Sequence, residues 1–297
     1  SSKTPNWRKA SRPFGENCGF TIGEATQYIV LMDDALAIDL AADVHGAVSD
    51  VFINADGIKR SISAPGAGNY VSFSKAVASA IAIVGESTVR KHSFIHAHGS
   101  STPANRVTES RIFDRVAEAF SIKDWPITAA KAFVGHSLAA ASGDQLAFAL
   151  GTFKYDILPG IKTVDKIADD VAQKRLFFPL QDMDLVNRKM DVAFVNSKGF
   201  GGNNATAVVL SPRKVENMLS ARYGSVMADY QSRREETRQA AKNYAEKADK
   251  GNIPVVYRFG EALVQEQDID ISCDGIHMPG HKQDVIFDKL NPWADMD

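Results

Sequence analysis

The sequence predicts a layered α/β fold for residues 1–211, and three observations carry that prediction. The composition is that of a globular protein, since 44% of the 297 residues are hydrophobic and 24% are charged. Short apolar runs alternate with amphipathic runs, as strands and helices do when they pack in layers. Two apolar runs near residue 200 flank a glycine-rich turn, which predicts a β-hairpin. A disordered or fibrous protein is excluded.

The expected strands rest on short apolar runs. The run at 28–32 predicts a buried strand, and residues 93–98 predict a second strand that ends at Gly99. The hairpin strands are expected at 192–195 and 205–210.

The expected helices rest on apolar residues at helical spacing. An alanine-rich amphipathic helix is expected at 73–84, and two further helices at 108–120 and 138–153. In the helix expected at 108–120, the apolar residues follow one another at spacings of four, one and three positions: Ile112, Val116, Ala117 and Phe120.

The composition changes at Pro212, where a second region is expected to begin and to run to residue 297. Residues 213–250 contain nine basic and six acidic residues, which predicts one or two long solvated helices ending before Gly251. The charge run at 233–238 indicates a solvated helix face, and a docking surface for an acidic partner is the alternative. After it the balance reverses to three basic and nine acidic residues, and 255–259 could form a short strand.

Several classes of protein are excluded by charge and composition. The net charge is −2, so no overall field attracts nucleic acid. A transmembrane helix needs about 20 apolar residues, and the longest nearly uninterrupted run, 76–84, is far shorter. Two cysteines exclude a disulfide scaffold and favour a reducing cytoplasm. Because the chain does not start with methionine, we expect it to begin inside a longer gene product.

Two histidine motifs point to chemistry. Residues 98–103, His-Gly-Ser-Ser-Thr-Pro, follow a predicted strand, and ligands bind at strand ends in α/β folds. His136 lies at a predicted helix start, where the helix N-terminus and Lys131 would lower its pKa. A neutral imidazole can donate a hydrogen bond to a carbonyl oxygen. The alternatives are an ordinary turn in the first motif and a helix cap with a surface lysine in the second.

A third motif, residues 196–205, is rich in glycine. Gly199, Gly201 and Gly202 permit positive φ, so the turn could aim amide N–H groups at an oxyanion. A dinucleotide fingerprint would need glycine where Asn204 stands, and no phosphate-binding loop occurs. A tight hairpin without a ligand is the alternative.

Taken together, the three motifs resemble the C-terminal half of the β-ketoacyl-acyl carrier protein synthases. That family has N-A-H-G-T-S-T-P, then K-S-x-x-G-H-x-x-G-A-A-G, then N-S-F-G-F-G-G-T-N, which match residues 98–103, 131–143 and 196–205. Arg-Pro-Phe at 12–14 and the segment 19–24 resemble the family's preceding motif. The resemblance covers about residues 5–210.

The resemblance implies a thiolase-like layered αβαβα fold. Residues 1–211 would supply its C-terminal half and part of its N-terminal half, and 212–297 would be a mostly helical extension. Short synthases lack this extension, so the chain is similar to a divergent, long-form (FabY-like) branch. Family members are usually homodimers, so a symmetric dimer is expected.

The implied activity is that of an acyltransferase, a 3-oxoacyl-[acyl-carrier-protein] synthase. It would join malonyl-acyl carrier protein to an acyl thioester by decarboxylative Claisen condensation, in fatty-acid or polyketide-like biosynthesis. The partners would be acyl carrier protein and these thioesters. No cofactor or metal of its own is expected, since phosphopantetheine arrives on acyl carrier protein or coenzyme A.

Site roles are carried over position by position. His98 and His136 would bind the malonyl thioester carbonyl and stabilise the enolate. Lys131 and Glu109 would contact each other and orient the site, and Phe200 would gate the acyl pocket and lend its backbone N–H to an oxyanion hole. The positions assigned to substrate binding are Ser100, Thr102, Gly199 and Gly201. Lys198 stands where the family has a phenylalanine and Asn203 where it has a threonine, so the resemblance does not carry over the shape of the pocket.

The nucleophile is the largest gap in this assignment. The resemblance places the family's cysteine upstream of Ser1, so an N-terminal half that bears it is expected elsewhere. Cys18 matches a loop, and Cys273 lies in the C-terminal region. A non-catalytic subunit like a chain-length factor, or a processed half that completes a partner's site, is the alternative. A metal site at His96 and His98, or at His277 and His281, is disfavoured.

Overall fold

The computed structural model describes residues 6–16, 19, 21–59, 66–254, 259–261, 263–291 and 294. The chain forms two compact units, Ser1–Gln239 and Ala240–Asp297, and each is described by itself. Within the part that the structure describes, no helix is both long enough and apolar enough to cross a membrane.

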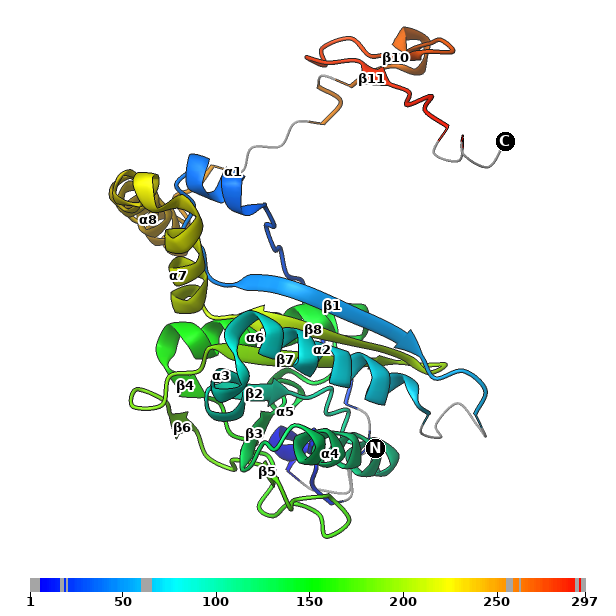
Figure 1. The fold of residues 1–297 in the computed structure, drawn as a ribbon, viewed down its shortest axis with the longest axis vertical. Coiled ribbons are helices and arrows are strands. Elements are labelled where there is room, and N and C mark those ends of the chain that lie inside the picture. The colour runs from blue at the N-terminus through cyan, green and yellow to red at the C-terminus, as the bar shows by residue number, and fades with distance from the viewer. Residues whose placement is uncertain are drawn as a thin grey trace. The chain divides into compact units, whose positions relative to one another are not determined.

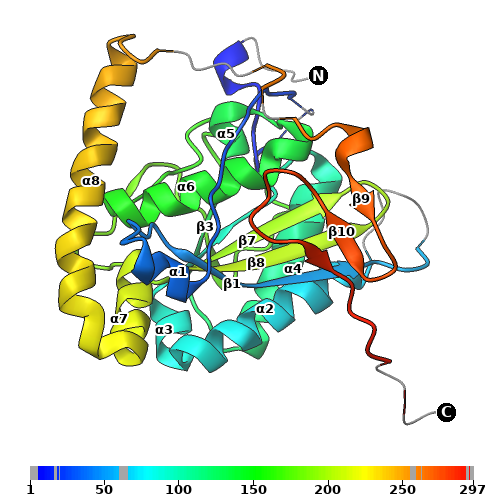
Figure 2. The ribbon, with the colours of Figure 1, turned by 90° about the horizontal axis from the view of Figure 1, so that it is seen from above.

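The first unit is built on a six-stranded mixed sheet (Figure 1). The strands, in spatial order, are β1 (Ala47–Ala55), β8 (Asn203–Leu210), β7 (Val192–Gly199), β2 (Ser93–His96), β3 (Trp125–Thr128) and β5 (Leu176–Phe177). Strands β7, β2, β3 and β5 are parallel, and β8 runs antiparallel to β7 and β1. Figure 2 shows β7, β8 and β1 side by side. The carboxyl ends of β2, β3 and β7 therefore meet at one edge of the sheet.

Helices cover both faces of the sheet, because successive residues of each buried strand point to opposite sides. In β7, Val192 and Phe194 join the large core beneath α2 (Gly68–Val84) and α4 (Pro103–Ala119). The alternate residues Ala193 and Val195 join a second core beneath α6 (Ala141–Tyr155). The layered α/β prediction is confirmed, and so are the helices expected at 73–84, 108–120 and 138–153, the last with a 3₁₀ turn at 138–140.

Short elements connect these layers. The helix α4 begins sharply because Thr102 accepts a hydrogen bond from the Asn105 N–H and Pro103 fills the first helical position. The remaining elements of this region are α1 (Asp34–Asp39), α3 (Glu86–Lys91), α5 (Lys131–Val134), β4 (Ile157–Leu158), which pairs with β6 (Met183–Asp184), and a 3₁₀ helix at 7–9.

One expected element is wrong. Residues 28–32 form no strand, and Tyr28, Val30 and Leu31 are 94%, 81% and 76% exposed rather than buried. The physical reason is that a strand needs a neighbouring strand for its backbone hydrogen bonds. No strand within the described ranges pairs with this segment.

The region after Pro212 is helical up to Asp249, as expected, in α7 (Pro212–Tyr223) and α8 (Met227–Asp249). The compact unit continues past residue 212, since Leu219 and Tyr230 are buried in the large core. Tyr230 also donates a hydrogen bond to the Ala42 carbonyl oxygen at 2.8 Å. The boundary predicted from the resemblance and the compositional change therefore does not coincide with the boundary of the compact unit.

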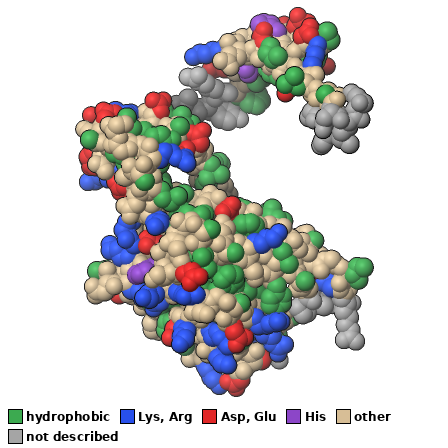
Figure 3. Space-filling view, viewed as in Figure 1, with side chains coloured by type: hydrophobic (Ala, Val, Ile, Leu, Met, Phe, Trp, Pro, Cys, Tyr) green, Lys and Arg blue, Asp and Glu red, His purple; other side chains and the backbone are tan. Residues whose placement is uncertain are grey.

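The second unit holds the end of α8 and a small sheet of β9 (Asp270–Ile271), β10 (Gly275–His277) and β11 (Val285–Ile286). None of its described residues is buried. Figure 3 shows acidic and hydrophobic side chains together on its surface. Most of the strand expected at 255–259 lies outside the described residues.

Candidate active site

The two predicted histidines come together at the carboxyl edge of the sheet. His98 lies two residues beyond the end of β2, and His136 lies just beyond α5, which follows the neighbouring strand β3. Their ring centroids are 5.1 Å apart and the rings are nearly perpendicular, at 79°. His98 is buried and His136 is half-buried. Two motifs 38 positions apart in the sequence thus form one site.

The surrounding backbone selects the same tautomer in both rings. The Lys198 N–H donates to His98 Nδ1 at 3.4 Å, and the Leu138 N–H donates to His136 Nδ1 at 3.0 Å. A neutral imidazole that accepts at Nδ1 carries its proton on Nε2. Each ring is therefore a hydrogen-bond donor at Nε2.

Both imidazoles are held neutral near pH 7. Burial, followed by the charges of Lys131, His136 and Lys198, holds the pKa of His98 well below its usual value. Burial and the charge of Lys131 lower the pKa of His136 to about 4. A 3₁₀ turn at 138–140 separates His136 from the start of α6 at Ala141, so the helix N-terminus expected at this ring is not directly beside it. Neutral donors suit an oxygen that gains negative charge.

Glu109 and Lys131 hold the His98 backbone from two sides. Glu109 is fully buried and accepts hydrogen bonds from the His98 N–H at 2.7 Å and the Gly99 N–H at 3.0 Å. Its other donors are the side chains of Asn105 and Asn196, each at 2.9 Å. Lys131 Nζ donates to the His98 carbonyl oxygen at 2.7 Å. The peptide groups of His98 are thereby fixed in orientation.

The resemblance implies a direct contact between Lys131 and Glu109, and the structure does not show one. In the described part of the chain neither a hydrogen bond nor an ion pair joins them, and both act on His98 instead. Burial lowers the pKa of Lys131 to about 8, and the charges of Glu109 and Asp144 oppose this shift.

Two polar residues of the site lacked a role in the sequence analysis. Gln145, on α6, is fully buried and donates from Nε2 to the carbonyl oxygens of His96, Ala97 and Asn196 at 2.9–3.1 Å. It ties the end of β2 to the end of β7. Asn196 belongs to the glycine-rich motif, and its amide links β7 to Glu109. The sequence feature that could have pointed to Gln145 is its place as a polar residue on the buried face of a helix.

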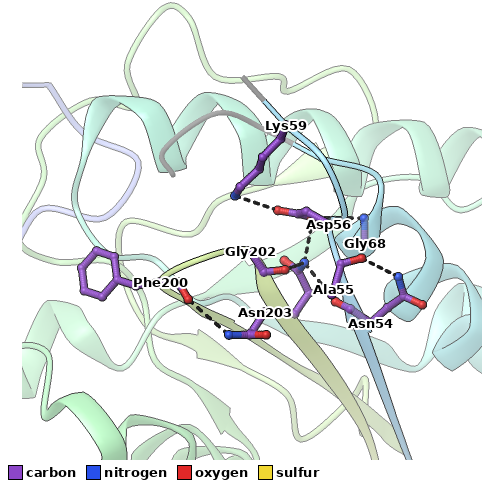
Figure 4. A network of polar contacts seen from close by, with 9 residues as sticks. Asn54, Ala55, Asp56, Lys59, Gly68, Phe200, Gly202 and Asn203 are labelled. Carbon is purple, nitrogen blue, oxygen red and sulfur yellow. Dashed lines mark hydrogen bonds and ion pairs between the residues drawn. The ribbon is translucent and has the colours of Figure 1, made fainter. Parts of the chain in front are cut away.

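The glycine-rich motif forms the turn between β7 and β8. Gly201 and Gly202 have φ of 84° and 92°, which only glycine adopts without strain. Phe200, at the tip, is 83% exposed, and its carbonyl oxygen accepts from the Asn203 side chain at 3.2 Å (Figure 4). Gly199 ends β7 opposite Asn203. The turn therefore presents Phe200 away from the protein core.

Asp56 braces this turn from the neighbouring strand end. Its carboxylate accepts from the Gly68 N–H at 3.0 Å and from the Asn204 side chain at 2.8 Å, and it pairs with Lys59 at 3.1 Å (Figure 4). Its own N–H donates to the Gly202 carbonyl oxygen at 2.8 Å. The hairpin is thus bonded to the start of α2.

Ser100 and Thr102 lie on the loop that follows His98. Their hydroxyl oxygens are 3.2 Å apart, and Thr102 also caps α4. One hydroxyl pair therefore lies between the histidine site and the helix start. Of the two cysteines, Cys18 lies outside the described residues and Cys273 is exposed in the second unit. Across the described ranges, no group of three or more His, Cys, Asp or Glu residues could hold a metal ion.

His96, on β2 beside the site, makes the protein sensitive to acid. It is fully buried, and burial together with the charge of Lys131 lowers its pKa to about 3. The folded protein then binds fewer protons than the unfolded chain below pH 6.5, so stability falls as the pH drops from about 6.5 towards 3. Each such histidine contributes a slope of about 1.4 kcal/mol per pH unit in that window.

We therefore expect His96→Asn to flatten the loss of stability between pH 6.5 and pH 5. The measurement is the free energy of unfolding in urea across that range, for the wild type and the variant. His98 and His136 retain their own contributions, so the slope should decrease without vanishing. A slope equal to that of the wild type would show that His96 is not a buried neutral group.

Comparisons with known proteins point to one family. Residues 45–165 match the family described as beta-ketoacyl synthase, C-terminal domain. Beta-ketoacyl-[acyl-carrier-protein] synthase FabY of Pseudomonas aeruginosa is 60% identical over 292 residues, which are 98% of this chain and 46% of the relative. The 3-oxoacyl-[acyl-carrier-protein] synthase 2 of Synechocystis is 30% identical over 203 residues, which are 66% of this chain and 45% of the relative.

Two solved structures are also similar to this chain. The crystal structure of the noncanonical ketosynthase FabY from P. aeruginosa is similar, with a TM-score of 0.90 over 98% of this chain and 46% of that one, at 60% identity. A type II polyketide ketosynthase in complex with its acyl-carrier protein is 22% identical and shares the fold, with a TM-score of 0.60 over 71% of this chain and 50% of that one.

The chain spans about half the length of the curated relatives it matches. The fold is thiolase-like, and the chain belongs to the β-ketoacyl-[acyl-carrier-protein] synthase family.

Proposed function

We propose that this chain is the histidine-bearing part of a 3-oxoacyl-[acyl-carrier-protein] synthase that condenses malonyl-acyl carrier protein with an acyl thioester in fatty-acid biosynthesis. The single observation that carries the proposal is the pair of neutral imidazoles, His98 and His136, with ring centroids 5.1 Å apart. Two Nε2–H donors on rings this close together can share one carbonyl oxygen.

The Nε2–H groups of His98 and His136 act in the decarboxylation step of this reaction. The malonyl thioester oxygen accepts from both Nε2–H groups. When the bond to the carboxylate breaks, carbon dioxide leaves and its electron pair passes into the thioester, which becomes an enolate. The two donors stabilise the charge on the enolate oxygen. The enolate carbon then attacks the acyl-enzyme thioester, and the cysteine thiolate leaves.

Glu109 and Lys131 position His98 in this scheme. Both bond to its peptide groups rather than to its ring, so neither needs to move a proton during the reaction. Ser100 and Thr102, on the same loop, are proposed to bind the phosphopantetheine arm that carries the malonyl group. Phe200, with Gly199 and Gly201, is proposed to form the gate of the acyl pocket and one N–H of its oxyanion hole.

The nucleophile is proposed to come from an upstream half of the synthase. Residues 28–32 support this, since an apolar segment with exposed side chains of Tyr28, Val30 and Leu31 needs a cover. One face of β1 also exposes Val51 and Ile53. We further propose that the synthase is a homodimer that receives its substrates from acyl carrier protein. The two cysteines favour the reducing cytoplasm as its location.

The test is a condensation assay on the whole synthase. Purified protein is mixed with malonyl-acyl carrier protein and an acyl primer, and the 3-oxoacyl product and the released carbon dioxide are measured by mass spectrometry and by isotope counting. We expect one carbon dioxide for each 3-oxoacyl product. Absence of both would contradict the proposal, and product formed only after a second ketosynthase is added would favour a non-catalytic subunit.

A further inference from the structure

Lys198 is a charged residue of the site that none of the assigned roles uses. It lies on β7, where the family pattern has phenylalanine, and its backbone N–H bonds His98 Nδ1. Its side chain is on the same face of the strand as that of Asn196, two residues earlier. Asn196 bonds Glu109, which in turn bonds the His98 N–H. The ammonium group therefore belongs to the side of the sheet where His98 is held.

No carboxylate among the described residues pairs with this ammonium group. Within the described ranges, the Lys198 side chain has neither an ion pair nor a hydrogen bond. The two carboxylates whose charges act on it are already engaged, Glu109 by four donors and Asp56 by Gly68, Asn204 and Lys59. Burial accordingly lowers the pKa of Lys198. A partly desolvated cation without a counter-ion favours an anionic ligand.

The charge of Lys198 acts on the imidazole of His98. It is one of the causes that lower the pKa of His98, together with burial and the charges of Lys131 and His136. Lys131 differs from it, because its Nζ is bonded to the His98 carbonyl oxygen. Lys198 is thus a cation whose charge acts on His98 and whose ammonium group is bonded to no described protein atom.

We propose that Lys198 binds the carboxylate of the malonyl group while His98 and His136 hold the thioester carbonyl oxygen of the same group. This inference rests on the proposed function and adds the residue that distinguishes a malonyl thioester from an acetyl thioester. The carboxylate leaves as carbon dioxide, so its contact with Lys198 is made in the ground state and lost during the reaction. Such a contact strengthens substrate binding without accelerating the chemical step.

The experiment compares Lys198→Met and Lys198→Arg in the whole synthase. We expect Lys198→Met to raise the KM for malonyl-acyl carrier protein at least about tenfold, with kcat unchanged or increased and the KM for the acyl primer unchanged. Lys198→Arg keeps the charge and should restore the KM to within about threefold. Lys154→Met, an exposed lysine on α6, is the matched control.

Binding measured without turnover separates this inference from the proposed function. Calorimetric titration with malonyl-coenzyme A should show weaker binding to Lys198→Met than to the wild type, while acetyl-coenzyme A binds both equally. Equal malonyl binding, or a parallel loss for both thioesters, would overturn the role of Lys198. A wild type that binds malonyl-coenzyme A selectively yet does not condense would instead contradict the proposed function.

Discussion

Replacing either His98 or His136 with alanine is expected to lower the condensation rate of the whole synthase by about 10²–10³-fold. Removing one preorganised donor to a developing oxyanion usually has an effect of this size. Both rings are neutral and protonated at Nε2, since backbone N–H groups occupy Nδ1, so each variant removes one such donor. The double variant should cost less than the product of the two single effects, because the two residues act on one oxygen.

The measurement is kcat and KM for malonyl-acyl carrier protein, together with the release of carbon dioxide. His45→Ala provides the matched control, since His45 is exposed in the loop before β1. It should retain the wild-type rate. Retention of the wild-type rate by both His98→Ala and His136→Ala would remove the basis of the site assignment.

The second large effect is expected on stability. We expect Glu109→Gln to lower the free energy of unfolding by about 2–4 kcal/mol. Each carboxylate oxygen of Glu109 accepts two hydrogen bonds, from His98 and Asn196 on one side and from Gly99 and Asn105 on the other. Glutamine keeps one oxygen and directs its NH₂ group at two donors, so two buried N–H groups lose their acceptor.

Urea denaturation of the whole synthase, followed by circular dichroism, measures this loss. Glu118→Gln is the control, because it makes the same change on α4 at an exposed glutamate that pairs with Arg175. A surface ion pair of this kind contributes less than about 1 kcal/mol. Equal losses in the two variants would mean that the Glu109 carboxylate does not hold the His98 loop. Condensation should fall with Glu109→Gln, since His98 loses its orientation.

The elements that the sequence predicted well are those whose pattern is local. The helices near 73–84 and 108–120 show apolar residues at helical spacing, and each buries that stripe in the core. The strand predicted at 28–32 was wrong for the opposite reason. Its apolar run satisfies the composition of a buried strand, yet the hydrogen bonds of a strand come from other segments, and no described strand lies beside it.

The residues of the site also differ in how far the sequence could predict them. His98 and His136 were predictable because each carries a motif, and the parallel neighbours β2 and β3 bring the two motifs to one edge. The role of Glu109 was not predictable in detail, since its four donors come from three separate segments. Gln145 carried no motif at all, and only the packing of α6 against the strand ends reveals its three carbonyl partners.

The pairing of β1 with β8 has a consequence for how the protein is made. In the described sheet β1 bonds to β8 alone, and Ala47 pairs with Leu210, far along the chain. A ribosome must therefore synthesise the whole intervening sequence before β1 finds its neighbour, and contacts of such long sequence separation form slowly. Until then β1 exposes both edges, so we expect the nascent chain to depend on chaperones that shield unpaired strands.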